Sequence, residues 1–127
     1  CIPKELSEGN WLAPTVVAGL DPDSRCSTEE IFGPVVTIHR FEGEARAVEI
    51  ANNTRYGLAG SVWTSDLEKG ERVAGMIHTG MVWVNTWLHR DLRVPFGGVK
   101  DSGVGREGGR WSLGFFSEPL NVCLKHE

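Results

Sequence analysis

The chain has 127 residues, of which 40% are hydrophobic and 24% charged, and its formal net charge is −4 at pH 7. This length suits one domain with a single hydrophobic core, and this composition excludes a disordered chain. The weak acidic excess gives no basic footprint for nucleic acid, and no apolar run approaches the roughly 20 residues that span a bilayer. We therefore expect neither nucleic acid nor a membrane among its partners.

The cysteines indicate a reducing compartment. There are three of them, an odd number, widely spaced at Cys1, Cys26 and Cys123, which fits free thiols better than a disulfide framework. The first residues have the character of neither a signal nor a transit peptide. The sequence therefore predicts a cytoplasmic protein.

The middle of the chain alternates between strand and helix patterns. Residues 35–41 are β-branched and follow the Gly33-Pro34 turn signal, which predicts a strand. Residues 44–53 carry apolar side chains at helical spacing and end in two asparagines, which predicts a helix with a C-cap. A turn at residues 56–57 is expected to lead into a second strand over residues 58–64.

The same alternation continues for one more helix and strand. Asp66 is suited to cap the N-terminus of a helix over residues 66–77. Residues 81–85 are apolar on both faces, so this third strand is expected to be buried on both. The resulting β-α-β-α-β order predicts an α/β fold with a parallel core.

The two flanks have a different character. Residues 1–28 show weak periodicity and are expected to form extended segments and turns. Residues 97–114 hold seven of the sixteen glycines, which predicts a shaped Gly-rich loop rather than a packed layer. A last strand over residues 120–125 is expected to close the chain.

Two kinds of motif that often indicate a function, a dinucleotide-binding loop and a histidine metal site, are not supported here. Gly103, Gly105 and Gly108 spell G-x-G-x-x-G, but the motif needs a βαβ unit of about 30 residues with an acidic residue about 20 positions further on. Only 19 residues remain after Gly108, so a dinucleotide loop of this type is rejected. The four histidines have no metal-ligand spacing, and no metal is expected.

Several segments resemble, in order and spacing, the C-terminal portion of the aldehyde dehydrogenase superfamily. The two most specific are Glu-Glu-Ile-Phe-Gly-Pro-Val at residues 29–35 and Pro-Phe-Gly-Gly-Val-Lys-Asp-Ser-Gly-Val-Gly-Arg-Glu-Gly-Gly at residues 95–109. Residues 11–16, 51–59 and 80–85 fit the same family. The resemblance covers nearly the whole chain.

The resemblance implies an NAD(P)-dependent oxidation of an aldehyde to a carboxylic acid. In that family a cysteine thiolate attacks the aldehyde, and a glutamate activates the water that hydrolyses the resulting thioester. Both groups and the Rossmann half lie upstream of the segments matched here, and Cys1, Cys26 and Cys123 lack the family's flanking residues. We therefore expect residues 1–127 to be the C-terminal part of a catalytic domain, inactive alone, with residues 120–127 as an oligomerisation tail of a homo-oligomer.

Two residues are implied to bind the cofactor, NAD or NADP. Glu30 matches the carboxylate that accepts hydrogen bonds from the ribose hydroxyls on the nicotinamide side. Phe32 matches the aromatic residue that flanks the nicotinamide. The alternative is structural: a glutamate that caps a helix and a phenylalanine in the core.

Three further roles follow from the Gly-rich segment. Phe96 matches an aromatic residue of the substrate tunnel, and Glu107 matches a buried glutamate in the proton path from the general base. Arg106 and Glu118 match an ion pair that ties the loop to the C-terminal segment. For Glu107, a proton relay and a structural brace remain open.

Residues 87–93 and 112–125 narrow the resemblance to the 2-hydroxymuconate and 2-aminomuconate semialdehyde dehydrogenases. Arg90 then matches an arginine at the substrate mouth, suited to bidentate pairing with a carboxylate on the substrate. The alternative is a surface contact of Asp91 with Arg90 or Arg93. Two other functions stay open: a non-catalytic binding or assembly module, and an enzyme for another aldehyde such as betaine aldehyde.

Overall fold

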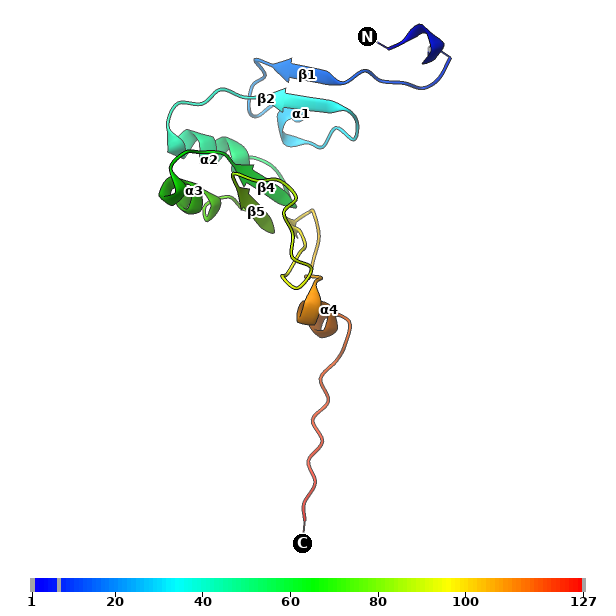
Figure 1. The fold of residues 1–127 in the computed structure, drawn as a ribbon, viewed down its shortest axis with the longest axis vertical. Helices are drawn as coiled ribbons and strands as arrows, with labels where there is room; N and C mark the ends of the chain where they lie inside the picture. The colour runs from blue at the N-terminus through cyan, green and yellow to red at the C-terminus, as the bar shows by residue number, and fades with distance from the viewer. Residues whose placement is uncertain (1, 7, 127) are drawn as a thin grey trace. The chain divides into compact units, whose positions relative to one another are not determined.

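The computed structural model describes residues 2–6 and 8–126, so Cys1 and the last residue of the expected tail, Glu127, lie outside the described residues (Figure 1). The chain divides into two compact units, Cys1–Arg55 and Tyr56–Glu127, and each is considered by itself. None of the helices in the described residues is long and apolar enough to cross a membrane.

The first unit is built on a parallel strand pair. Strand β1 (Thr15–Ala18) pairs with β2 (Val35–Ile38), with Thr15 opposite Val35. Helix α1 (Arg25–Thr28) lies on the connection between them, and α2 (Glu44–Asn52) follows β2. The strand predicted at residues 35–41 and the helix at 44–53 are confirmed with shorter ends. Strand β1 and the short 3-10 helix η1 (Lys4–Leu6) were not predicted, because the first 28 residues lack periodicity.

The second unit contains the predicted β-α-β crossover. Strands β4 (Ala59–Val62) and β5 (Met81–Val84) pair in parallel, and α3 (Leu67–Ala74) connects them (Figure 1). The predicted cap is confirmed, since the Asp66 side chain accepts a hydrogen bond of 3.0 Å from the backbone N–H of Lys69. The helix ends at Ala74 rather than at residue 77, with Gly75 as its C-cap.

A glycine lets α3 approach β5 closely. Gly70 is the buried residue of this helix. A Cβ at this position would lie 2.7 Å from the Cγ1 atom of Val84, closer than carbon atoms pack. The helix therefore rests on the strand through its backbone at this point.

The Gly-rich segment is more regular than the sequence predicts. Strand β6 (Val99–Lys100) pairs antiparallel with β3 (Tyr56–Gly57), which occupies the position where a turn was expected. Helix α4 (Gly109–Phe115) follows the loop and was not predicted, because two of its seven residues are glycines. The literal G-x-G-x-x-G thus lies between a two-residue strand and a short helix, not in a βαβ unit.

The expected single hydrophobic core is wrong for these residues. Trp83, 7% exposed, is the one large apolar side chain buried within the described part of the chain. The accessible surface is 10436 Å². A compact monomer of this mass exposes about 6,700 Å², and two separate compact units together expose about 8,000 Å². Many of the apolar faces of these helices and strands are therefore left uncovered by the chain itself.

The strand expected at residues 120–125 does not form within the described residues. Residues 117–126 form neither helix nor strand, and no segment in the described part of the chain pairs with them (Figure 1). Leu120, Val122 and Leu124 are 86%, 67% and 78% exposed. Their alternation is the strand pattern on which the prediction rested, but a strand needs a neighbour for its backbone hydrogen bonds.

Gly80 offers a direct test of how tightly the second unit packs. A Cβ there would lie 1.6 Å from the carbonyl oxygen of Gly97, which is backbone and cannot swing away. We expect Gly80→Ala to lower the free energy of unfolding by about 1–3 kcal/mol, measured by thermal unfolding of the purified protein. The matched control is Gly114→Ala in α4, where nothing lies within 4 Å. An unchanged melting temperature for Gly80→Ala would contradict this packing.

Candidate functional site

Glu30 and Phe32 lie on the irregular segment between α1 and β2. The Gly33 N–H donates to the Ile31 carbonyl at 2.7 Å, and the Val35 N–H donates to the Gly33 carbonyl at 2.8 Å. Each bond closes a three-residue turn, and Phe32 is the middle residue of the first. Phe32 is 97% exposed, so it does not belong to the core of this unit.

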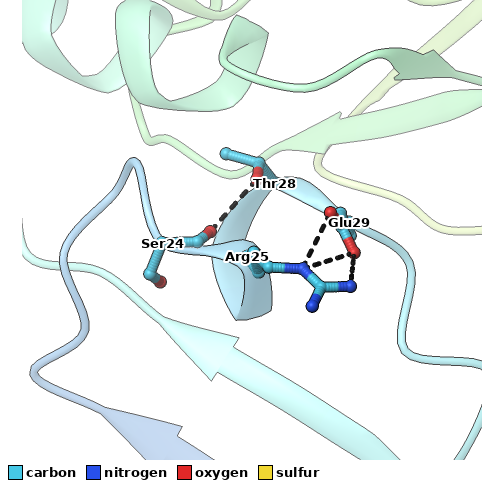
Figure 2. A network of polar contacts seen from close by, with 4 residues as sticks. All are labelled: Ser24, Arg25, Thr28 and Glu29. Atoms are coloured by element: carbon cyan, nitrogen blue, oxygen red, sulfur yellow. Dashed lines mark hydrogen bonds and ion pairs between the residues drawn. The ribbon is translucent and has the colours of Figure 1, made fainter.

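The neighbouring glutamate takes the structural role. Arg25 contacts both carboxylate oxygens of Glu29, with Nε–O distances of 3.0 and 3.1 Å and an Nη2–Oε2 distance of 2.8 Å (Figure 2). Hydrogen bonding to Arg25 lowers the pKa of Glu29 below its usual value. Glu29 also forms the C-cap of α1 through its backbone N–H.

Glu30 is left available by this arrangement. It is exposed and accepts no hydrogen bond from any residue that the structure describes. Two acidic residues in a row thus divide their roles: the first is held against the helix, and the second presents an unpaired carboxylate two residues before an exposed aromatic ring.

In the second unit, the segment before Arg90 is fixed by side chains of β5. The Trp83 Nε1–H donates to the His89 carbonyl at 2.8 Å, and the Trp87 ring meets the Trp83 ring edge to face with a centroid distance of 5.0 Å. Leu88 adopts a φ of 57°, a left-handed conformation that non-glycine residues rarely hold without support. The segment therefore has a defined path despite its irregular backbone.

Asn85 closes the base of this segment. Its side-chain oxygen accepts from the Thr64 N–H at 2.8 Å, and its side-chain nitrogen donates to the Thr64 carbonyl at 2.7 Å. Asn85 itself has a φ of 54°, which asparagine tolerates better than most residues. The amide group thus joins the ends of β4 and β5 where the chain leaves the sheet.

Three residues singled out from the sequence come together in this unit: Arg90, Phe96 and Glu107. The guanidinium carbon of Arg90 lies 3.9 Å from the centroid of the Phe96 ring, and its Nη2 lies 3.6 Å from Glu107 Oε1. Phe96 and Glu107 exchange two backbone hydrogen bonds of 2.8 Å in an antiparallel bridge. The bridge fixes the ring and the carboxylate relative to each other, and the arginine contacts both.

Of the two surface contacts left open at Asp91, the structure shows the one with Arg93. Arg93 forms a bidentate pair with Asp91, and its hydrogen bonds lower the pKa of that carboxyl. Arg90 contacts Phe96 and Glu107 instead, and its side chain is 31% exposed. A surface contact with Asp91 therefore does not account for the position of Arg90.

Two expectations for the Gly-rich segment need correction. Arg106 forms no ion pair with Glu118 among the described residues; its Nη1 donates to the carbonyls of Gly98 and Gly105 at 2.9 and 2.6 Å. These two carbonyls are close enough to share one donor, so the arginine braces the loop against itself. Glu107 was expected to be buried, but its side chain is 62% exposed because the described residues do not cover it.

A hollow of about 330 Å³ opens beside this loop. Phe96 and Glu107 line it together with Leu58, Val104 and the loop glycines. Phe115 and Phe116 contribute a T-shaped ring pair with centroids 4.9 Å apart. The wall thus has an aromatic and aliphatic part, and Ser102, Arg106 and Glu107 add polar and charged groups to it.

The site residues fall in both units, Glu30 and Phe32 in the first and Arg90, Phe96 and Glu107 in the second. Sequence reasoning missed the supporting roles of Trp83 and Asn85. Their signal was present, because a strand of apolar residues that ends in Asn places a polar side chain where a chain turns. No group of three or more potential metal ligands is found among the described residues.

The comparisons with known proteins agree on one family. The model of the aldehyde dehydrogenase family matches residues 2–122. The chain is 51% identical over 124 residues to the 2-hydroxymuconic semialdehyde dehydrogenase of Pseudomonas putida, covering 98% of this chain and 26% of that protein. It is 48% identical over 116 residues to the geranial dehydrogenase of Castellaniella defragrans, covering 91% of this chain and 24% of that protein.

A solved structure gives the same answer for the fold. The betaine aldehyde dehydrogenase of Staphylococcus aureus in complex with NAD+ superposes with a TM-score of 0.85 at 40% identity, covering 91% of this chain and 23% of that one. The chain thus spans about a quarter of the length of the proteins it matches. On this match along nearly all of its residues, the chain belongs to the aldehyde dehydrogenase family.

Proposed function

We propose that these residues form part of the catalytic domain of an NAD(P)-dependent aldehyde dehydrogenase that oxidises a carboxylate-bearing semialdehyde of the muconic type. The observation that carries the proposal is the placement of Arg90 against Phe96, where its guanidinium donates no hydrogen bond to any of the described residues. Identity of about 50% to a muconic semialdehyde dehydrogenase supports the same substrate class. We expect the nucleophilic cysteine and the general base from other parts of the enzyme, so the 127 residues alone should form no NADH.

The segment after α1 is suited to hold the cofactor. The exposed Glu30 carboxylate can accept charge-assisted hydrogen bonds from a ribose diol, and the Phe32 ring, 97% exposed on its tight turn, can limit the swing of a nicotinamide. When bound, NAD(P)+ accepts the hydride from the aldehyde carbon. Glu30 and Phe32 hold and orient; neither takes part in bond making.

Arg90 is suited to bind a substrate carboxylate. Its distance of 3.6 Å from Glu107 exceeds the 2.7–2.9 Å of a strong charge-assisted bond. The five N–H donors of the guanidinium are therefore not used by that contact. The guanidinium carbon lies over the Phe96 ring at 3.9 Å from its centroid, and donors directed away from the ring would remain for a planar, bidentate partner.

Phe96 and Glu107 complete the proposed substrate side. Phe96 lines the apolar wall along which the carbon chain of an aldehyde would lie. Glu107, joined to it by the backbone bridge, carries an exposed carboxylate suited to exchange protons with water in the site. A role for Glu107 as a brace of Arg90 fits the same geometry.

A betaine-type substrate is the second candidate, since a betaine aldehyde dehydrogenase shares the fold. A quaternary ammonium group binds best over an open aromatic face. Here the guanidinium of Arg90 already lies over the Phe96 ring, and its positive charge would repel such a substrate. The geometry therefore favours an anionic aldehyde.

A pair of chimeric enzymes tests the proposal. In the first, these residues replace the homologous segment of the Pseudomonas putida relative, and in the second that of the geranial dehydrogenase. We expect the first to keep kcat/KM for 2-hydroxymuconic semialdehyde with NAD+, and the second to gain activity on that substrate at the expense of geranial. A first chimera that folds, binds NAD+ and has lost its preference for the charged substrate would refute the substrate class. If both chimeras fold correctly but turn over no aldehyde, these residues are better explained as a non-catalytic assembly module.

The C-terminal segment is proposed to join another strand in a cytoplasmic homo-oligomer. Leu120, Val122 and Leu124 alternate along an exposed, unpaired chain, and such an edge is prone to association. Removing residues 120–127 from the first chimera should lower its sedimentation coefficient. Replacing Asn121 and Lys125, which alternate with the apolar residues, by serine is the control and should leave the assembly intact. Unchanged sedimentation with full activity after the deletion would show that the segment is dispensable.

A further inference from the structure

The path of the chain into Arg90 depends on one buried side chain. Trp83 is 7% exposed, and its indole N–H donates a 2.8 Å hydrogen bond to the backbone carbonyl of His89, the residue directly before Arg90. A buried donor with a single partner fixes that partner strongly, because losing the bond leaves the N–H unsatisfied. The bond therefore holds the peptide unit from which Arg90 begins.

The other contacts of the segment before Arg90 constrain its path less than this hydrogen bond does. Leu88 has a left-handed φ of 57°, and the residue is 61% exposed, so close packing around it does not enforce the conformation. Trp87 is itself 58% exposed and rests on the Trp83 ring. Residues 86–89 connect Asn85, whose side-chain amide bonds to Thr64, with Arg90. Among the described residues, the hydrogen bond that ties this connection to a buried side chain is the one from Trp83 to His89.

We propose that Trp83 is a positioning residue for substrate specificity: it sets the place of the Arg90 guanidinium over Phe96 without touching the substrate. This inference rests on the proposed role of Arg90 in binding a substrate carboxylate. Arg90 reaches both Phe96 and Glu107 from this anchored peptide, and a bidentate contact tolerates little displacement. Loosening the anchor should therefore weaken binding of charged substrates selectively.

The test compares charged and neutral aldehydes in the first chimera. We expect Trp83→Phe to raise KM for 2-hydroxymuconic semialdehyde about 2- to 10-fold, the effect of one neutral hydrogen bond, with kcat and the KM for a neutral aldehyde of similar length nearly unchanged. Trp63→Phe is the matched control, since Trp63 lies in the same unit, is 66% exposed and, among the described residues, donates its indole hydrogen bond to the nearby Ser61 hydroxyl. It should change neither KM.

A second variant separates the hydrogen bond from the shape of the ring. 3-Benzothienylalanine at position 83 keeps the bicyclic ring but has sulfur in place of the N–H, so it preserves packing even if Trp83→Phe fails to fold. It should reproduce the selective rise in KM. Equal effects on both substrates, or none, in this variant would overturn the positioning role.

Combining the change with Arg90→Ala distinguishes the two proposals. If Trp83 acts through Arg90, Trp83→Phe should have no further effect on the charged substrate once Arg90 is absent. If Arg90→Ala raises KM only for the charged substrate but Trp83→Phe affects charged and neutral substrates alike, the positioning role of Trp83 is refuted and the proposed role of Arg90 stands. An unselective Arg90→Ala would instead refute the proposed role of Arg90, and the positioning role with it.

Discussion

Replacing Arg90 with alanine in the first chimera should raise KM for 2-hydroxymuconic semialdehyde by about 10- to 150-fold. This range corresponds to the ~1.5–3 kcal/mol of a hydrogen bond to a charged group. The expected reason is that the guanidinium, whose carbon lies 3.9 Å from the centroid of the Phe96 ring, supplies the donors for the proposed substrate carboxylate. A neutral aldehyde of similar length has no partner for those donors, so its KM should change by less than about twofold. Steady-state kinetics on both substrates measure the difference.

Two variants control for charge and for local structure. Lysine at position 90 should recover only part of the loss, because it keeps the charge but lacks the planar fork. Arg93→Ala removes a nearby arginine that pairs with Asp91 instead, and it should leave KM for the charged substrate nearly unchanged. Equal losses for charged and neutral substrates in Arg90→Ala would mean that Arg90 serves only to brace Glu107.

Glu30→Gln should impair use of the cofactor in the same chimera. The carboxylate, left unpaired by the described residues, is proposed to accept hydrogen bonds from the ribose diol. A neutral amide loses the charge-assisted part of that interaction, about 1.5–3 kcal/mol, so kcat/KM for NAD+ should fall by about 10- to 150-fold. Single-turnover measurement of NADH formation should show slower hydride transfer, because the nicotinamide is held less firmly.

The adjacent residue provides the control. Glu29→Gln makes the same chemical change one position away, where Arg25 holds the carboxylate and lowers its pKa. It should leave the kinetics with NAD+ within about twofold, since an exposed pair of this kind contributes little. If both variants behave alike, Glu30 has a structural role and does not contact the cofactor.

The regular elements were predictable where local chemistry decides them. The helix cap at Asp66 and the strand β5 are decided by residues that are neighbours in sequence. Both lie where they were expected. Strand β1 and the β3–β6 pair depend on partners up to about 45 positions away, for which the sequence holds no local signal. The tail at residues 120–125 has a strand pattern but no partner in the described chain, so the pattern alone did not suffice.

The sequence singled out candidate site residues but not their contacts. The family resemblance singled out Arg90, Phe96 and Glu107, and the structure brings them together. It did not indicate that Arg106 bonds to backbone carbonyls of the loop instead of Glu118. Such a choice depends on where a folded loop places its carbonyl groups, which composition and spacing do not encode.

The close backbone contacts of the second unit bear on how the substrate range of such a protein can diverge. Gly80 meets the Gly97 carbonyl, Gly108 meets the Val94 carbonyl, and Phe96 bridges to Glu107 through main-chain bonds. The scaffold of the loop is thus held by main chain, while the proposed discrimination between aldehydes depends on side chains such as that of Arg90. A codon change at position 90 can therefore alter the accepted aldehyde while the surrounding architecture persists. Changes at the glycines would instead destabilise that architecture through backbone clashes.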